Sequence, residues 1–423
     1  MTVAAPVPVA KARATTEDRR SIIVGLVLLA LGVVVFWAFG LGTSSELDTT
    51  FNLGLPNYRF PDLSWVVNAR TLAFVAAAAL VGLGVQRLLR AKLRWTNIAL
   101  GVGLALFVLS LLAWASAGKQ FSMVGMLRSM VISSIVITLG ALTGIMCERA
   151  GIVNIGIEGQ LLTAAFAATV LSSAFGTLAG VLGGMAIAGL LGALLAWLAI
   201  RFRVDQIIAG VVINIFALGL TSFLASRVLS EVQDLNAPAR VPSIRIPLLS
   251  DIPVLGPMFF DHTFFVYGAF LLVAALQVGF FRTRWGLRAR AVGEHPRAAD
   301  TLGINVHRVQ YRNVILGGLI AGFGGAFLAL SQVSRFEENM TGGIGYIGLA
   351  AMIFGRWMPV GALAAGLVFG FSGAFAQKLA ILSTPIPSEF LLMTPYVATI
   401  IVVAGVVGRA RAPAAENQPY IKE

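Results

Sequence analysis

Long apolar runs alternate with short polar segments along almost the whole chain. Runs of about 20 apolar residues are what a helix needs to cross the hydrocarbon core of a bilayer. A membrane barrel would instead show short alternating segments, and that pattern is absent. We therefore predict an all-α polytopic membrane protein with about twelve transmembrane helices, near residues 21–41, 65–86, 98–117, 126–147, 151–174, 177–200, 206–229, 262–281, 312–332, 343–356, 359–378 and 389–408.

Composition points the same way. Of the 423 residues, 58% are hydrophobic and only 12% are charged, and the mean hydropathy is +0.87. A soluble chain of this size would need about twice that charged fraction to cover its surface. Cys147 is the single cysteine, which excludes an intrachain disulfide and a thiolate metal cluster.

Basic residues concentrate in the loops that the twelve crossings place on one side of the membrane. The clusters after the second, sixth, eighth and last predicted helices all share a side with the basic N-terminus. The long loop 230–261 falls on the other side and carries more acidic than basic residues. The positive-inside rule then predicts a cell-membrane protein with both termini cytoplasmic. It also explains the net charge of +12 without a nucleic-acid-binding face.

The stretch GIVNIGIEGQ (151–160) places an acid and two amides among three glycines, between apolar runs. A charged group deep in a bilayer costs about 2.5–3.5 kcal/mol on insertion scales, so it normally faces a cavity or a partner. Glycines allow a helix to break there and free backbone groups. Either Asn154, Glu158 and Gln160 line or border a pathway for a polar solute, or Glu158 caps or pairs with a neighbouring helix. Asn214 is interpreted as a helix-to-helix hydrogen bond.

A second informative stretch is the basic loop 282–311, RTRWGLRARAVGEHPRAADTLGINVHRVQY. Pro296 can begin a helical turn and Gly303 can end it, which predicts a short helix outside the membrane. A helix of this length is marginal alone, so something must hold it. It either lies on anionic lipid or docks into a soluble partner.

Both stretches, followed by a third, FEENMTGGIGYIGLAAMIFGRWMPVGALAAGLVFG (336–370), occur in this order in a family of permease subunits. These belong to ATP-binding-cassette importers of the ribose, branched-chain amino acid and nucleoside branch. The chain resembles this family over about 98–408, and its NIGIEGQ form resembles the nucleoside permeases. The resemblance implies a ten-helix core similar to the vitamin B12 importer permease. A basic N-terminus (1–20) and a two-helix extension (21–97) would precede it, and a tail (409–423) would follow.

The resemblance also implies a mechanism. Two permease chains of different sequence would form the pathway, and two ATPase subunits would bind ATP and Mg on the inside. An extracytoplasmic binding lipoprotein would deliver the solute, most often a nucleoside in this branch. The chain itself would need no cofactor or metal and would not be an enzyme. A coupling helix would carry the residues at the matching motif positions, with the two alanines entering a cleft on the ATPase: Glu294, Arg297, Ala298, Ala299 and Gly303.

Other functions are less well supported by the residues. Gly118-Lys119 is the closest fragment of a phosphate-binding P-loop, and Gln120 breaks it. The G-x-G-x-x-G at 343–348 lacks a preceding strand, and the G-x-S-G around Ser372 lacks a nearby base. A permease for pentose or other sugars stays open, as does an ion-coupled secondary transporter, which would place ionisable relay residues within its helices.

Overall fold

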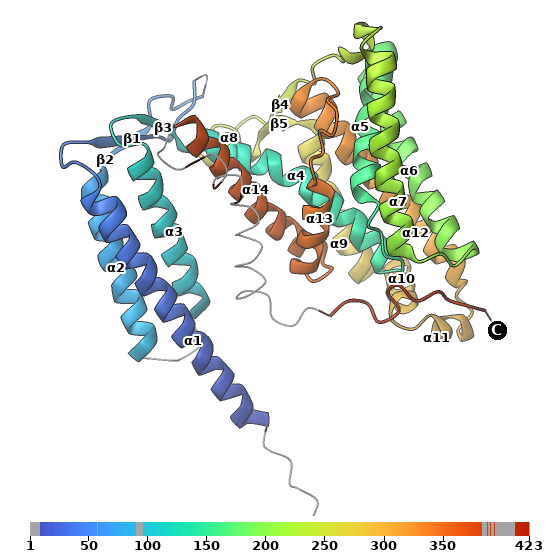
Figure 1. Cartoon of the computed structure of the whole chain (residues 1–423), viewed down its shortest axis with the longest axis horizontal. Coiled ribbons are helices and arrows are strands. Elements are labelled where there is room, and N and C mark those ends of the chain that lie inside the picture. The colour runs from blue at the N-terminus through green and yellow to red at the C-terminus, as the bar shows by residue number, and fades with distance from the viewer. Residues whose placement is uncertain are drawn as a thin grey trace, which may run out of the picture. The chain divides into compact units, whose positions relative to one another are not determined.

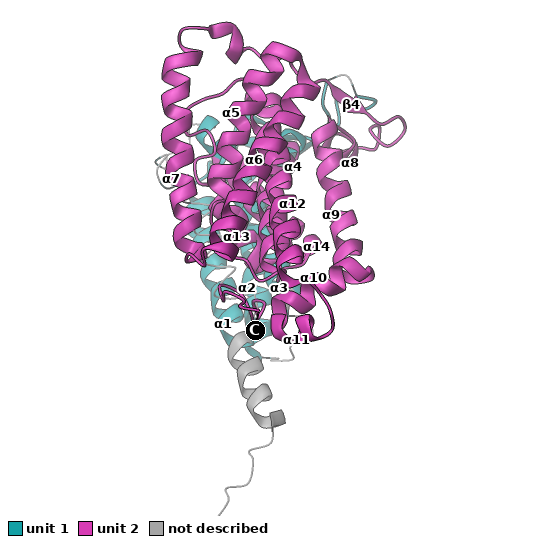
Figure 2. Ribbon diagram, turned by 90° about the vertical axis from the view of Figure 1, so that its right-hand side faces the viewer, with its two compact units in different colours: residues 1–126, 377–391 teal, residues 127–376, 392–423 magenta. Residues whose placement is uncertain are grey.

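Apolar helices account for most of the computed structural model, which describes residues 9–56, 58–89, 96–382, 387, 390, 393 and 411–422. Within these residues, nine helices are long and apolar enough to cross a membrane. The polytopic helical fold predicted from the sequence is thus confirmed, whereas the predicted helix 389–408 falls almost wholly outside the described residues. The chain divides into two compact units, residues 1–126 with 377–391 and residues 127–376 with 392–423 (Figure 2).

Unit 1 contains three helices and a small sheet. Its helices and π-helical turn are α1 (Val9–Val34), η1 (Val35–Leu41), α2 (Ala69–Leu89) and α3 (Thr96–Ala115). Its strands are β1 (Asp48–Asn52), β2 (Ser64–Asn68) and β3 (Gln120–Ser122), ordered β2-β1-β3 with β1–β2 antiparallel and β1–β3 parallel (Figure 1).

The second predicted helix therefore begins four residues later than expected. The Trp-Val-Val run at 65–67 favours extended backbone because β-branched and aromatic residues suit a strand. Asn68 then caps α2, since its Oδ1 accepts a hydrogen bond from the Thr71 N–H at 3.0 Å. Local side-chain chemistry overrides the apolar pattern at this end.

The third helix packs with the first two. The ring of Phe39 in η1 lies 5.9 Å from that of Phe107 and 5.3 Å from that of Trp114, both in α3. Leu28 and Leu80 are fully buried between α1 and α2. Within the described residues these three helices thus pack together, and the predicted two-helix extension (21–97) stays a prediction.

Unit 2 holds most of the remaining helical residues; the first residues of α4 and the last of α14 belong to unit 1. α4 is largely buried, and α12 packs against both α5 and α6. The helices and turns of this unit are α4 (Met123–Glu148), α5 (Ile157–Phe175), α6 (Thr177–Arg201), α7 (Gln206–Leu224), η3 (Ala225–Leu229), η4 (Gln233–Asn236), α8 (Leu255–Phe259), α9 (Phe264–Arg282), α10 (Arg284–Glu294), α11 (Pro296–Thr301), α12 (Val306–Phe327), η5 (Leu328–Val333), α13 (Ile344–Phe354) and α14 (Pro359–Ile381).

Small residues allow these helices to approach closely. A Cβ at Gly322 in α12 would lie 2.3 Å from the Met185 Cα in α6, so only glycine fits there. Gly318, one turn earlier, similarly faces the α6 backbone at Ala188. The glycines spaced by four along α12 therefore serve helix packing, as their pattern predicts.

The two ends of unit 2 carry different secondary structure. α10 and α11 stand at one end, and α8 with the strand β4 stands at the other (Figure 2). There β4 (Ser243–Arg245) pairs antiparallel with β5 (Asp261–Thr263), so α9 begins at Phe264 instead of residue 262.

Candidate functional site

Two helices begin within the bundle rather than at its surface. The chain turns at Gly151 after α4, and α5 begins only at Ile157, six residues later than predicted. Gly140, eight positions before the end of α4 at Glu148, lies close to Ile157 and to Gly348 of α13. At a rise of about 1.5 Å per residue, the start of α5 lies roughly 12 Å in from the end of α4. With only 11 residues, α13 is itself too short to span a bilayer.

Glu158 holds the first turn of α13. Its carboxylate oxygens accept hydrogen bonds from the backbone N–H groups of Gly343 at 2.7 Å and Gly345 at 2.6 Å. The first N–H groups of a helix lack internal partners, and a carboxylate beside them also favours the positive end of the helix dipole. The Glu158 side chain is 8% exposed. In this conformation Glu158 therefore caps a neighbouring helix, and a direct part in the pathway stays a prediction.

Asn214 in α7 hydrogen-bonds to backbone groups around the non-helical segment between α4 and α5. Its Nδ2 donates to the Ile155 carbonyl at 2.9 Å and to the Tyr346 hydroxyl at 3.0 Å. Its Oδ1 accepts from the Gly159 N–H at 2.8 Å. Asn214 thus bonds to three segments that meet here, which confirms its interpretation as a helix-to-helix hydrogen bond.

The other two polar residues of the motif are fully buried beside this break. Asn154 Nδ2 donates to Gln160 Oε1 at 3.1 Å, and Gln206 Oε1 accepts from the Val153 N–H at 2.7 Å. Asn154 Oδ1, Gln160 Nε2 and Gln206 Nε2 have no hydrogen-bond partner among the described residues. These amides do not line an open pathway in this conformation, but they keep unused hydrogen-bonding groups next to the two helix starts.

A second polar contact joins the end of α4 to the turn between α13 and α14. The indole N–H of Trp357 donates to Glu148 Oε2 at 2.6 Å, and Arg149 Nε and Nη2 donate to the Trp357 carbonyl at 3.1 and 3.0 Å. Arg356 and Trp357 adopt left-handed backbone angles, with φ of 56° and 52°, which cost energy for non-glycine residues. Both ends of α13 are thus tied to the segment around the break in α4–α5.

The basic loop folds as a pair of short helices. The predicted helix after Pro296 is present as α11, with Pro296 in its first turn and Gly303 in the left-handed region (φ 79°) just beyond it. The His295 side chain caps α11, because its Nδ1 accepts from the Ala298 N–H at 3.2 Å. The preceding helix α10, rich in arginine, was not predicted, and its signal was the helix-forming run RWGLRARAVGE.

The predicted coupling residues divide into two groups. Ala299 is only 2% exposed and packs in a cluster with Val292 and Val306 of the adjoining helices. Its small side chain therefore packs inside this chain in this conformation, whereas the sequence predicted that it would enter a cleft on a partner. The remaining four are exposed: Glu294, Arg297, Ala298 and Gly303.

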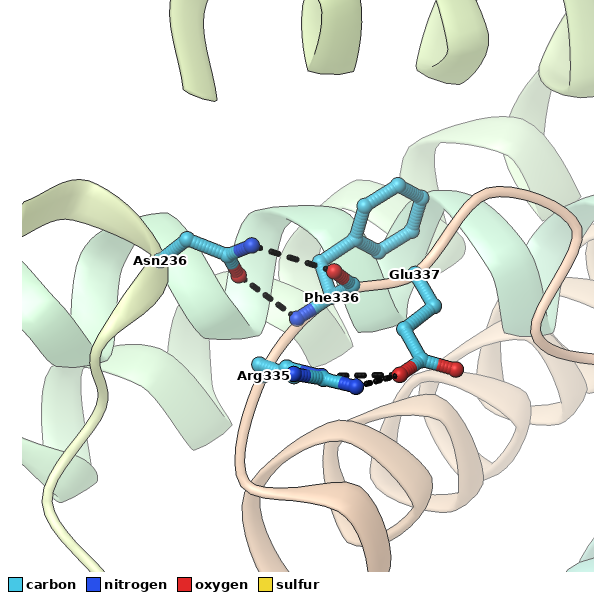
Figure 3. Close-up of polar contacts among 4 residues, drawn as sticks. All are labelled: Asn236, Arg335, Phe336 and Glu337. Atoms are coloured by element: carbon cyan, nitrogen blue, oxygen red, sulfur yellow. Dashed lines mark hydrogen bonds and ion pairs between the residues drawn. The ribbon is translucent and has the colours of Figure 1, made fainter. Parts of the chain in front are cut away.

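At the opposite end of unit 2, Asn236 joins two loops (Figure 3). Its Oδ1 accepts from the Phe336 N–H at 2.6 Å and its Nδ2 donates to the Phe336 carbonyl at 3.1 Å. The buried Phe336 ring lies 5.1 Å from the Phe166 ring, edge to face. Next to it, Arg335 and Glu337 form an exposed ion pair. The loop after α7 and the loop before α13 thus present one fixed surface.

An apolar bundle with two internal helix starts and an exposed helix pair at one end is the architecture of a membrane transport protein. Residues 126–410 match the family described as the branched-chain amino acid transport system permease component. The chain belongs to this family of permeases.

Individual relatives narrow the comparison. The chain is 41% identical over 300 residues to the guanosine ABC transporter permease protein NupQ of Bacillus subtilis, covering 67% of this chain and 92% of that protein. It is 39% identical over 305 residues to the nucleoside ABC transporter permease protein NupC of Lactococcus lactis, covering 70% and 96%. A putative glucose ABC transporter permease protein of Haloferax volcanii, TsgC13, is 30% identical over 331 residues, covering 71% and 98%. No solved structure matches significantly.

Proposed function

We propose that nucleosides are the substrates of this chain, which is a permease subunit of an ATP-binding-cassette importer. The single observation that carries the importer assignment is α11, a short exposed helix between the spans α9 and α12 in a chain of this permease family. The relatives at 41% and 39% identity are named for guanosine and nucleosides, whereas the sugar-named relative is 30% identical. These similarities favour a nucleoside over a sugar.

The arrangement of charges supports a membrane orientation and a set of partners. The basic α10–α11 pair would lie in the cytoplasm with both chain termini, where an ATPase subunit that binds ATP and Mg would receive α11. The fixed surface around Asn236, including Glu337, would face outward toward a substrate-binding lipoprotein. A second permease chain, of different sequence, would complete the pathway. The core would resemble that of the vitamin B12 importer.

The half-helix α13 is the element best placed to gate the pathway. Its first turn depends on the Glu158 carboxylate, and its last turn is held at Trp357. A shift of α13 would free N–H groups and expose the amides of Asn154 and Gln160, whose unused atoms could then meet water or a solute. Glu158 would act by positioning, and the two amides would border the pathway only in the shifted state.

Uptake in cells tests this proposal. Labelled guanosine, uridine and ribose are supplied to cells with the gene, without it, and with it restored beside a catalytically dead partner ATPase. Loss of nucleoside uptake on deletion, regained only with an active ATPase, is the expected result. Loss of ribose uptake alone would move the substrate to sugars and keep the architecture. Nucleoside uptake that survives deletion would contradict the proposed substrate.

A further inference from the structure

The segment 411–422 runs beside the helix pair α10–α11 (Figure 1). It lies beyond the part of the chain that matches the permease family, which ends at residue 410. Segments this polar, with alanine, proline and lysine, have little reason to pack unless contacts hold them. Here Pro413 and Ala415 are nonetheless buried.

The first contacts are made at the end of α10. The Ala415 N–H donates to the Gly293 carbonyl at 2.9 Å, and the Ala414 N–H reaches Glu294 Oε2 at 3.4 Å. The last carbonyls of a helix lack partners within it, so an outside N–H satisfies one of them here. The segment thereby fixes the end of α10, from which α11 follows after one residue.

Further contacts are made with α11 and with the start of α12. Lys422 Nζ lies 3.7 Å from Asp300 Oδ1 of α11, and the Tyr420 ring lies 5.4 Å from the ring of His307 in α12. Tyr420 also packs on the apolar cluster that contains Ala299. A six-residue helix is marginal without tertiary contacts, and this segment supplies two of them, at Asp300 and at the cluster that contains Ala299.

The same segment also lies at the C-terminal end of α13, the helix that we propose gates the pathway. Ala412, Pro413, Glu416 and Asn417 line a cleft of about 500 Å³ together with Glu148, Met352 and Trp357. Burial raises the pKa of the Glu416 carboxyl above its ordinary value, which fits a side chain enclosed in this cleft. One short stretch therefore contacts both the coupling helix and the α13–α14 turn.

We propose that the segment 411–422 is a brace that positions α11 and joins it to the inner end of α13. This inference rests on the proposed function, because only a transporter with an ATPase gives α11 a movement to transmit. Movement of α11 would then reach α13 through the brace as well as along the chain through α12. A segment that merely covered α11 would have to leave before an ATPase could bind, whereas a brace stays docked throughout the cycle.

Deletion of residues 411–423 in the assembled transporter is the first test, with the family-matched region left intact. Nucleoside uptake should fall at least tenfold, while membrane insertion and ATPase binding persist and ATP hydrolysis no longer responds to loaded binding protein. Uptake within twofold of wild type would overturn the brace. Wild-type uptake measured alongside separates this outcome from failure of the proposed function, in which wild type itself would import no nucleoside.

A point variant refines the test. Tyr420→Asp places a charge against the apolar cluster and should reproduce the deletion phenotype. Arg411→Asp changes an exposed residue at the start of the same segment, away from the α11 pocket, and should leave uptake unchanged. Equal uptake by the two variants would contradict a role for the docked Tyr420 ring.

Cross-linking distinguishes a brace from a removable cover. The double variant Lys422→Cys/Asp300→Cys keeps Tyr420 in place and puts two cysteines at a pair of positions whose charged atoms lie 3.7 Å apart. It is joined with a short, cleavable bifunctional thiol reagent; the natural cysteine, Cys147, is buried and out of reach. A brace predicts that the cross-linked transporter retains at least half of the uptake of the same variant before cross-linking. Abolished uptake on cross-linking, regained on release, would show that the segment must leave and would overturn the proposal.

Discussion

Replacing Glu158 by glutamine tests the contact that positions α13. The substitution keeps the size of the side chain but removes its charge and one of its two acceptor oxygens. The wild-type carboxylate accepts two short hydrogen bonds, from Gly343 and Gly345. Glutamine can accept only one of them, and its NH₂ group must then face the other N–H.

The expected loss follows from these bonds. A hydrogen bond to a charged group contributes about 1.5–3 kcal/mol, and a neutral one about 0.5–1.5 kcal/mol. The variant loses one hydrogen bond to a charged acceptor and weakens the other. This loss of stabilisation is partly offset because burying a neutral amide costs less free energy than burying a carboxylate. We expect the free energy of unfolding to fall by roughly 1–3 kcal/mol, which for a chain of 423 residues lowers the melting temperature by about 1–3 °C.

Thermal unfolding of the purified protein in detergent measures this loss. Glu231→Gln makes the same chemical change at an exposed residue and should leave the melting temperature unaltered. Glu158→Ala, which removes both acceptors, should melt lowest of the three variants. A Glu158→Gln protein that melts at the same temperature as the control, within about 0.5 °C, would refute the capping argument.

Three further changes test other parts of the account. Ala299→Leu should overpack the cluster under α11, destabilise it by about 1–3 kcal/mol, abolish uptake and make the loop sensitive to proteolysis. Ala298→Leu, on the exposed face of α11, should leave the loop resistant to proteolysis. Equal resistance of the two variants would contradict the assignment of Ala299 to the buried face and Ala298 to the exposed face. Asn214→Leu leaves the buried Ile155 carbonyl and Gly159 N–H without their hydrogen-bond partner and should lower the free energy of unfolding by about 2–4 kcal/mol. An unchanged melting curve would argue against a stabilising role for the Asn214 hydrogen bonds. Asn236→Ala should loosen the loop at Phe336 and reduce binding-protein-dependent uptake several-fold without altering basal ATP hydrolysis. Full uptake by this variant would contradict the proposal that the binding protein docks on the surface around Asn236.

Much of the helical layout could be predicted because apolar runs of spanning length are long and unambiguous. The short helix after Pro296 was equally predictable, since its start and stop residues are local signals. The polar stretch 151–160 also indicated correctly where the helical structure is interrupted between α4 and α5. Its helix start was set too early because Gly151 adopts a positive φ of 85° and the backbone of Val153 and Ile155 is hydrogen-bonded to side chains of α7. No local pattern records the contacts with α7.

The partners of the site residues could not be predicted. Glu158 meets Gly343 and Gly345 only because α5 and α13 begin at similar depth, and these residues lie far apart in the chain. Ala299 was expected on an exposed face because its size, and not its neighbours, was visible in the sequence. The contacts of Trp357 and of the segment 411–422 depend on folding of the whole unit. Charged residues beside apolar runs, such as Glu148 and Arg149, were the only available hint.

The most direct test of the central claim is nucleoside uptake into proteoliposomes that hold this chain with its partner subunits. The account predicts accumulation only when ATP is present on the side of the ATPase, unchanged when ionophores collapse proton and sodium gradients. It also predicts that Ala298→Glu, on the exposed face of α11, abolishes accumulation. Uptake that proceeds without ATP and vanishes with the ion gradient would contradict it and identify a secondary transporter.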